Sequence, residues 1–225
     1  MRLRWIALLA PAVLAVAACG GGSGGKDDQS GPDPKRDRDL ANAIAFHQYD
    51  FPAGWEQIDF AAQGSPPTME TLAQCLGPAP STTAEFTNGY HFGPGINEVA
   101  VVEVKVLPTA EAAAKVIAPT VKPAFGPCVV DHIKGLLSTS LGADLTLADL
   151  TGSASTITNA TANGVAIDMT AHLTSPRGPL TSYPAAVFLQ RGRVVATVTL
   201  LSDNLSTADF SRSLSAAVAN RMPAD

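Results

Sequence analysis

The chain has 225 residues and a formal net charge of −5, from 15 basic and 20 acidic side chains. This length suffices for one large hydrophobic core, and no linker divides the chain after its N-terminal region. The mildly acidic composition argues against nucleic acids and anionic lipid headgroups as partners, because both are bound by clustered Lys and Arg side chains.

The N-terminal residues have the pattern of a lipoprotein export signal. Arg2 and Arg4 precede an apolar run over residues 6–18, and a Val-Ala-Ala-Cys sequence ends at Cys19. The run is too short to cross the roughly 30 Å hydrocarbon core of a bilayer, but it suits a signal peptide. The ending resembles a bacterial lipobox, which implies cleavage before Cys19 and diacylation of its thiol; an ordinary secretory signal is the alternative. We therefore expect residues 1–18 to be a lipoprotein signal peptide and the mature chain to be extracytoplasmic, lipid-anchored to the bacterial cell membrane.

Residues 19–39 are predicted to form a flexible tether. Residues 20–25 are Gly and Ser only, and residues 26–39 mix charged side chains with Pro and Gly without an apolar face. Such a segment behaves as flexible coil with a mean reach of roughly 25 Å. We therefore expect one folded domain over residues 40–225, held just off the bilayer.

The first half of that domain is predicted to contain short helices followed by strands. Apolar residues at helical spacing predict a helix from Leu40 until Pro52, and a second helix is predicted over Thr68–Leu76. A strand is predicted to start at Glu56. Two further strands are predicted around residues 84–92 and over residues 99–106, where valines alternate with charged residues.

The second half is predicted to return to helix and then to sheet. Helices are expected over residues 110–118 and from Cys128 to Gly142. Strict alternation predicts a strand over residues 165–173, residues 187–201 have the pattern of a hairpin, and a capping box at Ser206 predicts a last helix. Runs of neighbouring strands indicate an antiparallel β-sheet with helices packed against it, which is a single α+β domain.

The cysteine count indicates one disulfide. Acylation of Cys19 leaves Cys75 and Cys128 as a pair, and two cysteines outside the cytoplasm usually form a bond. The alternative is two free thiols or half of a metal site, but no Cys-x-x-Cys occurs and the four histidines are scattered. We expect a disulfide that stabilises the fold by roughly 4 kcal/mol in the chain-entropy model, and neither a metal nor another cofactor.

No familiar catalytic motif is present, so we do not expect an enzyme. Asp168 and His172 share one face of a predicted strand, but four residues along a strand separate them by roughly 13 Å, too far for a hydrogen bond. A solvent-facing strand surface explains them better. The carboxylates of Glu98, Glu103 and Asp131 do not have the spacing of a calcium site.

Four ring-bearing residues are the candidate lining of a ligand cleft. Trp55, Tyr90, His91 and Phe92 lie near predicted strand ends, and a Gly-Pro-Gly loop follows at residues 93–95. An aromatic rim beside such a loop is suited to an apolar ligand. Packing of Trp55 and Phe92 in the core is the alternative, and we favour it.

Several local patterns together resemble envelope lipoproteins of actinobacteria. They are Phe51-Pro52-Ala53-Gly54-Trp55, Cys75-Leu76-Gly77, the valine-rich strand 99–106, Thr109-Ala110-Glu111-Ala112-Ala113 and Gly126-Pro127-Cys128-Val129. Their arrangement over most of residues 45–222 is similar to the α+β domains compared with PsbP-like proteins and to the extracellular sensor domain of the mycobacterial kinase PknH. The PknH-like domain is expected to carry two disulfides, whereas this chain can form one, so the PsbP-like comparison fits better. The resemblance implies a non-catalytic, sensor-like domain whose cleft binds an apolar envelope component or a partner protein.

Two functions are therefore expected. The first is a lipid-anchored binding lipoprotein for a lipid or another apolar envelope ligand. The second is an accessory or protein-interaction lipoprotein that supports an envelope transporter or sensor. A closed apolar pocket favours the first and an exposed patch favours the second, while a hydrolase with a non-standard site is a weaker third hypothesis.

Overall fold

The computed structural model describes residues 33–60, 72–78, 81–93, 98–140, 144–158, 162–202 and 207–223. The predicted signal peptide, Cys19, most of the predicted tether and the first four residues of the predicted helix 68–76 lie outside these ranges. Within them, no helix combines the length and the apolar composition that crossing a membrane requires.

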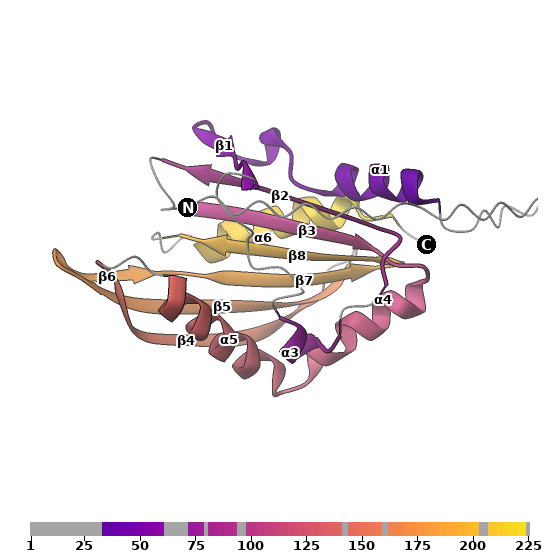
Figure 1. Ribbon diagram of the computed structural model, residues 1–225. Helices are drawn as coiled ribbons and strands as arrows, with labels where there is room; N and C mark the ends of the chain where they lie inside the picture. The colour runs from indigo at the N-terminus through magenta and orange to yellow at the C-terminus, as the bar shows by residue number, and fades with distance from the viewer. Residues whose placement is uncertain are drawn as a thin grey trace, which may run out of the picture. The chain divides into compact units, whose positions relative to one another are not determined.

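A twisted antiparallel sheet forms the middle of the domain (Figure 1). Along the sheet the strands follow the order β1-β2-β3-β8-β7-β5-β4, and β6 pairs with β5 alone. Their bounds are β1 (Trp55–Gln57), β2 (Ala84–Phe92), β3 (Glu98–Val106), β4 (Thr146–Thr158), β5 (Asn163–Ser175), β6 (Gly178–Ser182), β7 (Ala185–Arg191) and β8 (Val194–Leu201). The predicted antiparallel α+β fold is confirmed.

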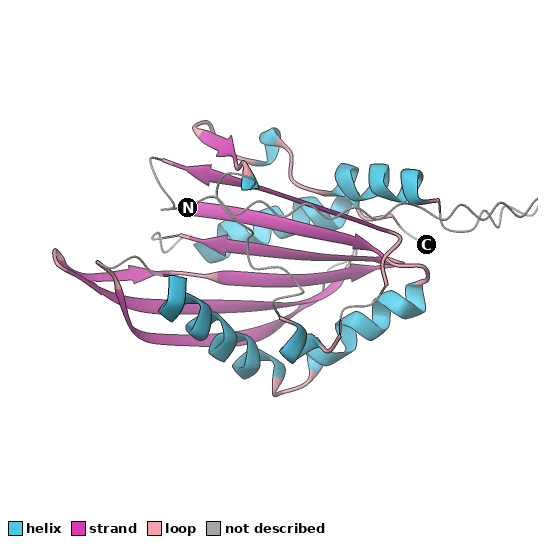
Figure 2. Cartoon of the chain, in the orientation of Figure 1, coloured by secondary structure: helices cyan, strands magenta, loops and turns pink. Residues whose placement is uncertain are grey.

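Helices cover both faces of the sheet (Figure 2). One face carries α1 (Pro34–Ile44) and α6 (Thr207–Arg221), and the other carries α3 (Ala73–Leu76), α4 (Ala110–Ile117) and α5 (Phe125–Ser140). Two 3-10 helices, η1 (Gln48–Asp50) and η2 (Ala118–Val121), follow α1 and α4. The domain therefore has three layers, with the sheet in the centre.

The two faces of the sheet bury separate hydrophobic clusters. Val102 of β3 packs in one cluster with Ile44 of α1 and Leu214 of α6. Ile167 of β5 packs in the other cluster with Val129 of α5. Because successive side chains of a strand point to opposite faces, the central strands must be apolar on both sides. This explains why β7 and β8 are nearly continuous apolar runs.

Helix α1 begins at Pro34, six residues before the predicted start of the domain at residue 40. Asp33 caps the helix, because its side chain accepts hydrogen bonds from the backbone N–H groups of Lys35 and Arg36. Pro34 occupies the first turn, where its missing N–H leaves no hydrogen bond unmade. Residues 34–39, which the sequence assigns to the flexible tether, are therefore helical instead.

Two further differences concern the start of α5 and the whole of β4. Helix α5 begins at Phe125 instead of Cys128, so Pro127 lies inside its first turn, which tolerates proline. Strand β4 was not predicted, because its exposed residues are small and polar and have no hydrophobic alternation. It is the edge strand beside β5. It occupies most of the segment between the predicted helix that ends at Gly142 and the predicted strand that begins at residue 165, for which the sequence predicts no element.

Candidate functional site

Trp55 and Tyr90 lie in the core instead of lining an open cleft. They are 6% and 5% exposed. The Phe51 ring centroid lies 4.4 Å from that of Tyr90 and 5.0 Å from that of Trp55, and Phe210 of α6 lies 5.4 Å from Trp55. The alternative of core packing, which named Trp55 and Phe92, therefore describes Trp55, and Tyr90 is buried as well.

Phe92 and His91 have different surroundings, although they are adjacent in the chain. Phe92 pairs with Trp55 across β1 and β2, their ring centroids are 6.1 Å apart, and Phe92 remains 43% exposed. His91 pairs with Glu56, so it points to the opposite face of the sheet from Tyr90 and Phe92. The structure thus brings three of the four predicted residues together and separates His91 from them.

Burial also affects the acid–base chemistry of this aromatic cluster. The apolar surroundings of the Tyr90 phenol raise its pKa, and the nearby Asp50 carboxylate acts in the same direction. Both effects favour the neutral phenol, which suits a ring packed in the core.

Cys75 and Cys128 form a disulfide, as the cysteine count predicts, with their Cα atoms 5.8 Å apart. The bond fixes the short helix α3 against the first part of α5. Beside it, the side chain of Gln74 hydrogen-bonds to His132, which lies one helical turn after Cys128.

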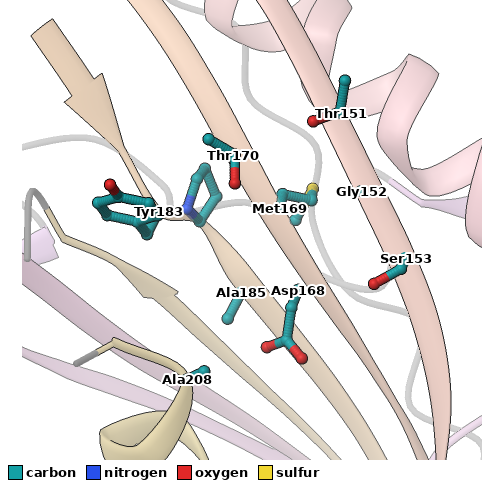
Figure 3. Close-up of a pocket in the computed structure, with 10 residues that line it drawn as sticks. Thr151, Gly152, Ser153, Asp168, Met169, Thr170, Tyr183, Ala185 and Ala208 are labelled. Carbon is teal, nitrogen blue, oxygen red and sulfur yellow. The ribbon is translucent and has the colours of Figure 1, made fainter. Parts of the chain in front are cut away.

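A depression of about 450 Å³ lies where β4, β5 and β7 meet the N-terminal end of α6 (Figure 3). Its volume is within the usual range for small-molecule sites. The lining is mostly small or polar, and it consists of Thr151, Gly152, Ser153, Asp168, Met169, Thr170, Tyr183, Pro184, Ala185 and Ala208. None of these residues except Asp168 was singled out from the sequence.

The sheet register explains why polar groups collect at this depression. Thr151 pairs with Thr170 and Ser153 pairs with Asp168 across β4 and β5. Directly opposite residues of an antiparallel pair share one face, so these four side chains project together. Helix α6 packs on β7 and β8, and no helix of the described ranges packs on the β4 side of this face.

Asp168 has no catalytic base partner on its strand. His172 lies four residues further along β5, pairs with Asp149 of β4 and is exposed. Their spacing along the strand is roughly 13 Å, as the sequence predicts. In the described part of the chain, no group of His, Cys, Asp and Glu side chains is arranged to hold a metal ion.

Comparisons with known proteins find a likeness of structure only. No family model matches the chain, and no curated protein matches it. The extracellular domain of PknH from Mycobacterium tuberculosis aligns with a TM-score of 0.42 at 12% identity, covering 81% of this chain and 96% of that domain. Cyanobacterial PsbP (CyanoP) from Synechocystis sp. PCC 6803 aligns with the same TM-score and identity, covering 80% of this chain and 89% of that protein. Neither likeness, at this TM-score, decides what the chain binds or does.

Proposed function

We propose that the chain is a non-catalytic, extracytoplasmic binding lipoprotein that supports an envelope assembly, and that it acts through the open polar face of β4 and β5. The observation that carries this proposal is that no described helix packs on that face of β4, whereas α1 and α6 pack on the same face of β2, β3, β7 and β8. Thr151, Ser153 and Ser155 of β4 are all exposed there.

The chemistry of the face favours reversible contact over permanent burial. Its hydroxyl groups are hydrated in the free protein and both donate and accept hydrogen bonds. Interfaces of this composition contain both direct and water-mediated hydrogen bonds, and they do not need a large apolar patch. A surface of this kind suits an accessory domain that engages its partner only part of the time.

In-cell photocrosslinking tests the proposal. A photoreactive phenylalanine analogue replaces Ser155 in the full-length chain, and the matched control carries the same analogue at Glu111. Glu111 is exposed on α4, on the opposite side of the sheet. We expect specific crosslinked species from position 155 that are absent from position 111. Identical patterns from both positions, or no species from position 155, would contradict the proposal.

An apolar envelope ligand is the second candidate function. The observation that favours it is the exposed ring surface of Phe92 beside Trp55 at the β1–β2 end of the sheet. Native mass spectrometry of the gently purified chain tests it. A retained lipid-sized adduct that disappears in Phe92→Ala supports this function, whereas a clean mass in both proteins excludes a tightly held apolar ligand.

A further inference from the structure

Four polar side chains form a flat array on the floor of the depression. Thr151 and Ser153 of β4 lie opposite Thr170 and Asp168 of β5. Opposite residues have Cβ atoms about 5 Å apart, and alternate residues of one strand are about 7 Å apart. Three hydroxyls and one carboxylate are therefore spaced over an area comparable to a single sugar ring (Figure 3).

Tyr183 stands beside this array on a backbone that is fixed from both sides. Its N–H donates to the Ser202 carbonyl at 2.7 Å. The carbonyl of the next residue, Pro184, accepts from the Met169 N–H at 2.9 Å. These bonds attach the segment between β6 and β7 to β5 and to the end of β8. These bonds hold the backbone of Tyr183, a lining residue, at the edge of the depression before any ligand arrives, which lowers the entropy cost of binding.

The polar groups of the lining disfavour two broad ligand classes. Its ionisable groups are the Asp168 carboxylate and the Tyr183 phenol, with no Lys or Arg among the described lining residues, so a phosphate or carboxylate ligand would meet repulsion. A purely apolar ligand would strip water from the hydroxyls and the carboxylate without replacing their hydrogen bonds. The remaining ligands are neutral or cationic and carry many hydrogen-bonding groups.

A cationic ligand matches the lining less well than a neutral one. Ammonium groups are typically held by several aromatic faces, whereas Tyr183 is the single aromatic ring among the described lining residues. Sugar hydroxyls both donate and accept, as do those of Thr151 and Thr170, and the two oxygens of Asp168 can accept from neighbouring hydroxyls of one ring. The apolar face of a sugar ring can pack on the Tyr183 ring.

We propose that this depression is a carbohydrate-binding site that recognises a neutral sugar unit through Asp168, the three hydroxyls and Tyr183. The proposal rests on the proposed function, since it names the ligand class of the same open face. The sugar can belong to a free saccharide or to an envelope polysaccharide, because both present the same ring hydroxyls.

Saturation-transfer difference NMR on the full-length chain tests the site. The chain is purified in a detergent without a sugar headgroup, and the probes are neutral mono- to tetrasaccharides, purified envelope polysaccharide, and glycine betaine as a cationic competitor. We expect transfer to sugar ring protons. Signals from the small saccharides identify a free sugar as ligand, and signals confined to the polysaccharide identify the envelope polymer.

Two site variants and one control make the assignment specific. Asp168→Asn removes the charge and keeps the shape, and Tyr183→Ala removes the ring; each is expected to weaken sugar binding at least tenfold. Asp149→Asn changes an exposed carboxylate of β4 outside the lining and is expected to alter binding less than twofold. Circular dichroism checks that each variant is folded.

Several outcomes would overturn the carbohydrate assignment. These are no transfer to any neutral saccharide or to the polysaccharide, transfer to glycine betaine alone, or transfer that both site variants leave unchanged. If no saccharide shows transfer but crosslinking from position 155 persists, the open face still binds a protein and only the carbohydrate assignment fails. If sugar binding depends on Asp168 but position 155 yields no crosslinked species, the proposed assembly fails and the sugar site stands.

Discussion

Asp37 is fully buried, although it belongs to a stretch whose composition predicts a solvated tether. Arg193, in the turn between β7 and β8, donates to both carboxylate oxygens and also to the Leu107 carbonyl. This fork-shaped contact joins residues 156 positions apart and fixes the start of α1 on the sheet. Asp37 lies in a segment rich in charged residues, and nothing in that segment indicates a buried arginine partner far along the chain. The sequence therefore could not predict this ion pair.

Asp37→Asn is expected to lower the free energy of unfolding by about 2 kcal/mol, because it leaves a partly buried guanidinium without its carboxylate. The matched control is Asp39→Asn. Asp39 is two-thirds exposed and pairs with Lys35 on the surface, so its loss is expected to cost less than about 0.5 kcal/mol. Urea denaturation of both variants measures the difference, and equal losses would contradict a special role for Asp37.

The same ion pair predicts a direction of pH dependence. The hydrogen bond from Arg193 lowers the pKa of the Asp37 carboxyl, and this effect outweighs the opposing effect of burial. A carboxyl with a lowered folded-state pKa contributes its stability above its ordinary pKa, about 3.9, and loses it as the pH falls through the folded-state pKa. The stability difference between the wild type and Asp37→Asn should therefore be constant near neutral pH and shrink below about pH 4.

Among the elements, strand β4 shows most clearly what hydropathy cannot detect. An edge strand with one open face needs apolar residues only where α5 covers it, and Leu150 is its buried apolar position. The run Thr151-Gly152-Ser153-Ala154-Ser155 does alternate with period two, between hydroxyl and small residues. That alternation was the available signal for both the strand and the polar site. By contrast, β3 and the β7–β8 hairpin were predicted closely, because valines and other residues that favour strands recur along them.

Strand β5 contains a glycine that its pairing with β7 requires. A Cβ atom added at Gly164 would overlap the Phe188 carbonyl oxygen, which belongs to the rigid backbone of β7. Gly164→Ala is therefore expected to destabilise the fold by about 2–3 kcal/mol. Gly135 of α5 is the matched control, since an added Cβ there would meet nothing within 4 Å. Gly135→Ala should stabilise the fold by up to about 1 kcal/mol, and thermal unfolding that moves both variants in the same direction would contradict this account.

The disulfide connects α3, a helix of only 4 residues, to the first part of α5. Cys75 and Cys128 are 53 positions apart, and closing a loop of that length is worth about 4 kcal/mol in the chain-entropy model. The Cys75→Ser/Cys128→Ser double variant is expected to lose stability of this order in urea. Adding a reductant should bring the wild type to the stability of the variant and leave the variant unchanged. A variant that stays sensitive to reductant would show that another bond is involved.

For the whole molecule, the sequence predicts the class of fold but not its layers. The order of strand and helix patterns indicates an antiparallel sheet with helices, and the structure has that arrangement. The sequence does not assign helices to faces, because the central strands are apolar on both sides and each helix has only one buried stripe. The same ambiguity explains the predicted ligand cleft. The sequence favours the core for Trp55 but leaves a rim open, because it does not give the position of α6, whose Phe210 completes the core beside Trp55.

At the scale of the whole molecule, the predicted attachment to the membrane depends on one thiol, that of Cys19. If the Val-Ala-Ala-Cys sequence is a lipobox, Cys19 carries the acyl chains, and two or more chains hold a protein at a bilayer far more firmly than one. Cells fed an alkyne fatty acid should therefore label the wild-type chain and not Cys19→Ser, because serine offers no thiol for the diacylglyceryl group. The Cys75→Ser/Cys128→Ser variant is the control and should keep the label, since it retains Cys19. Label that persists in Cys19→Ser, or an intact mass that places the mature N-terminus at another residue, would remove the anchor from this account. The open β4–β5 face would then belong to a protein that reaches its partners by diffusion instead of from the membrane surface.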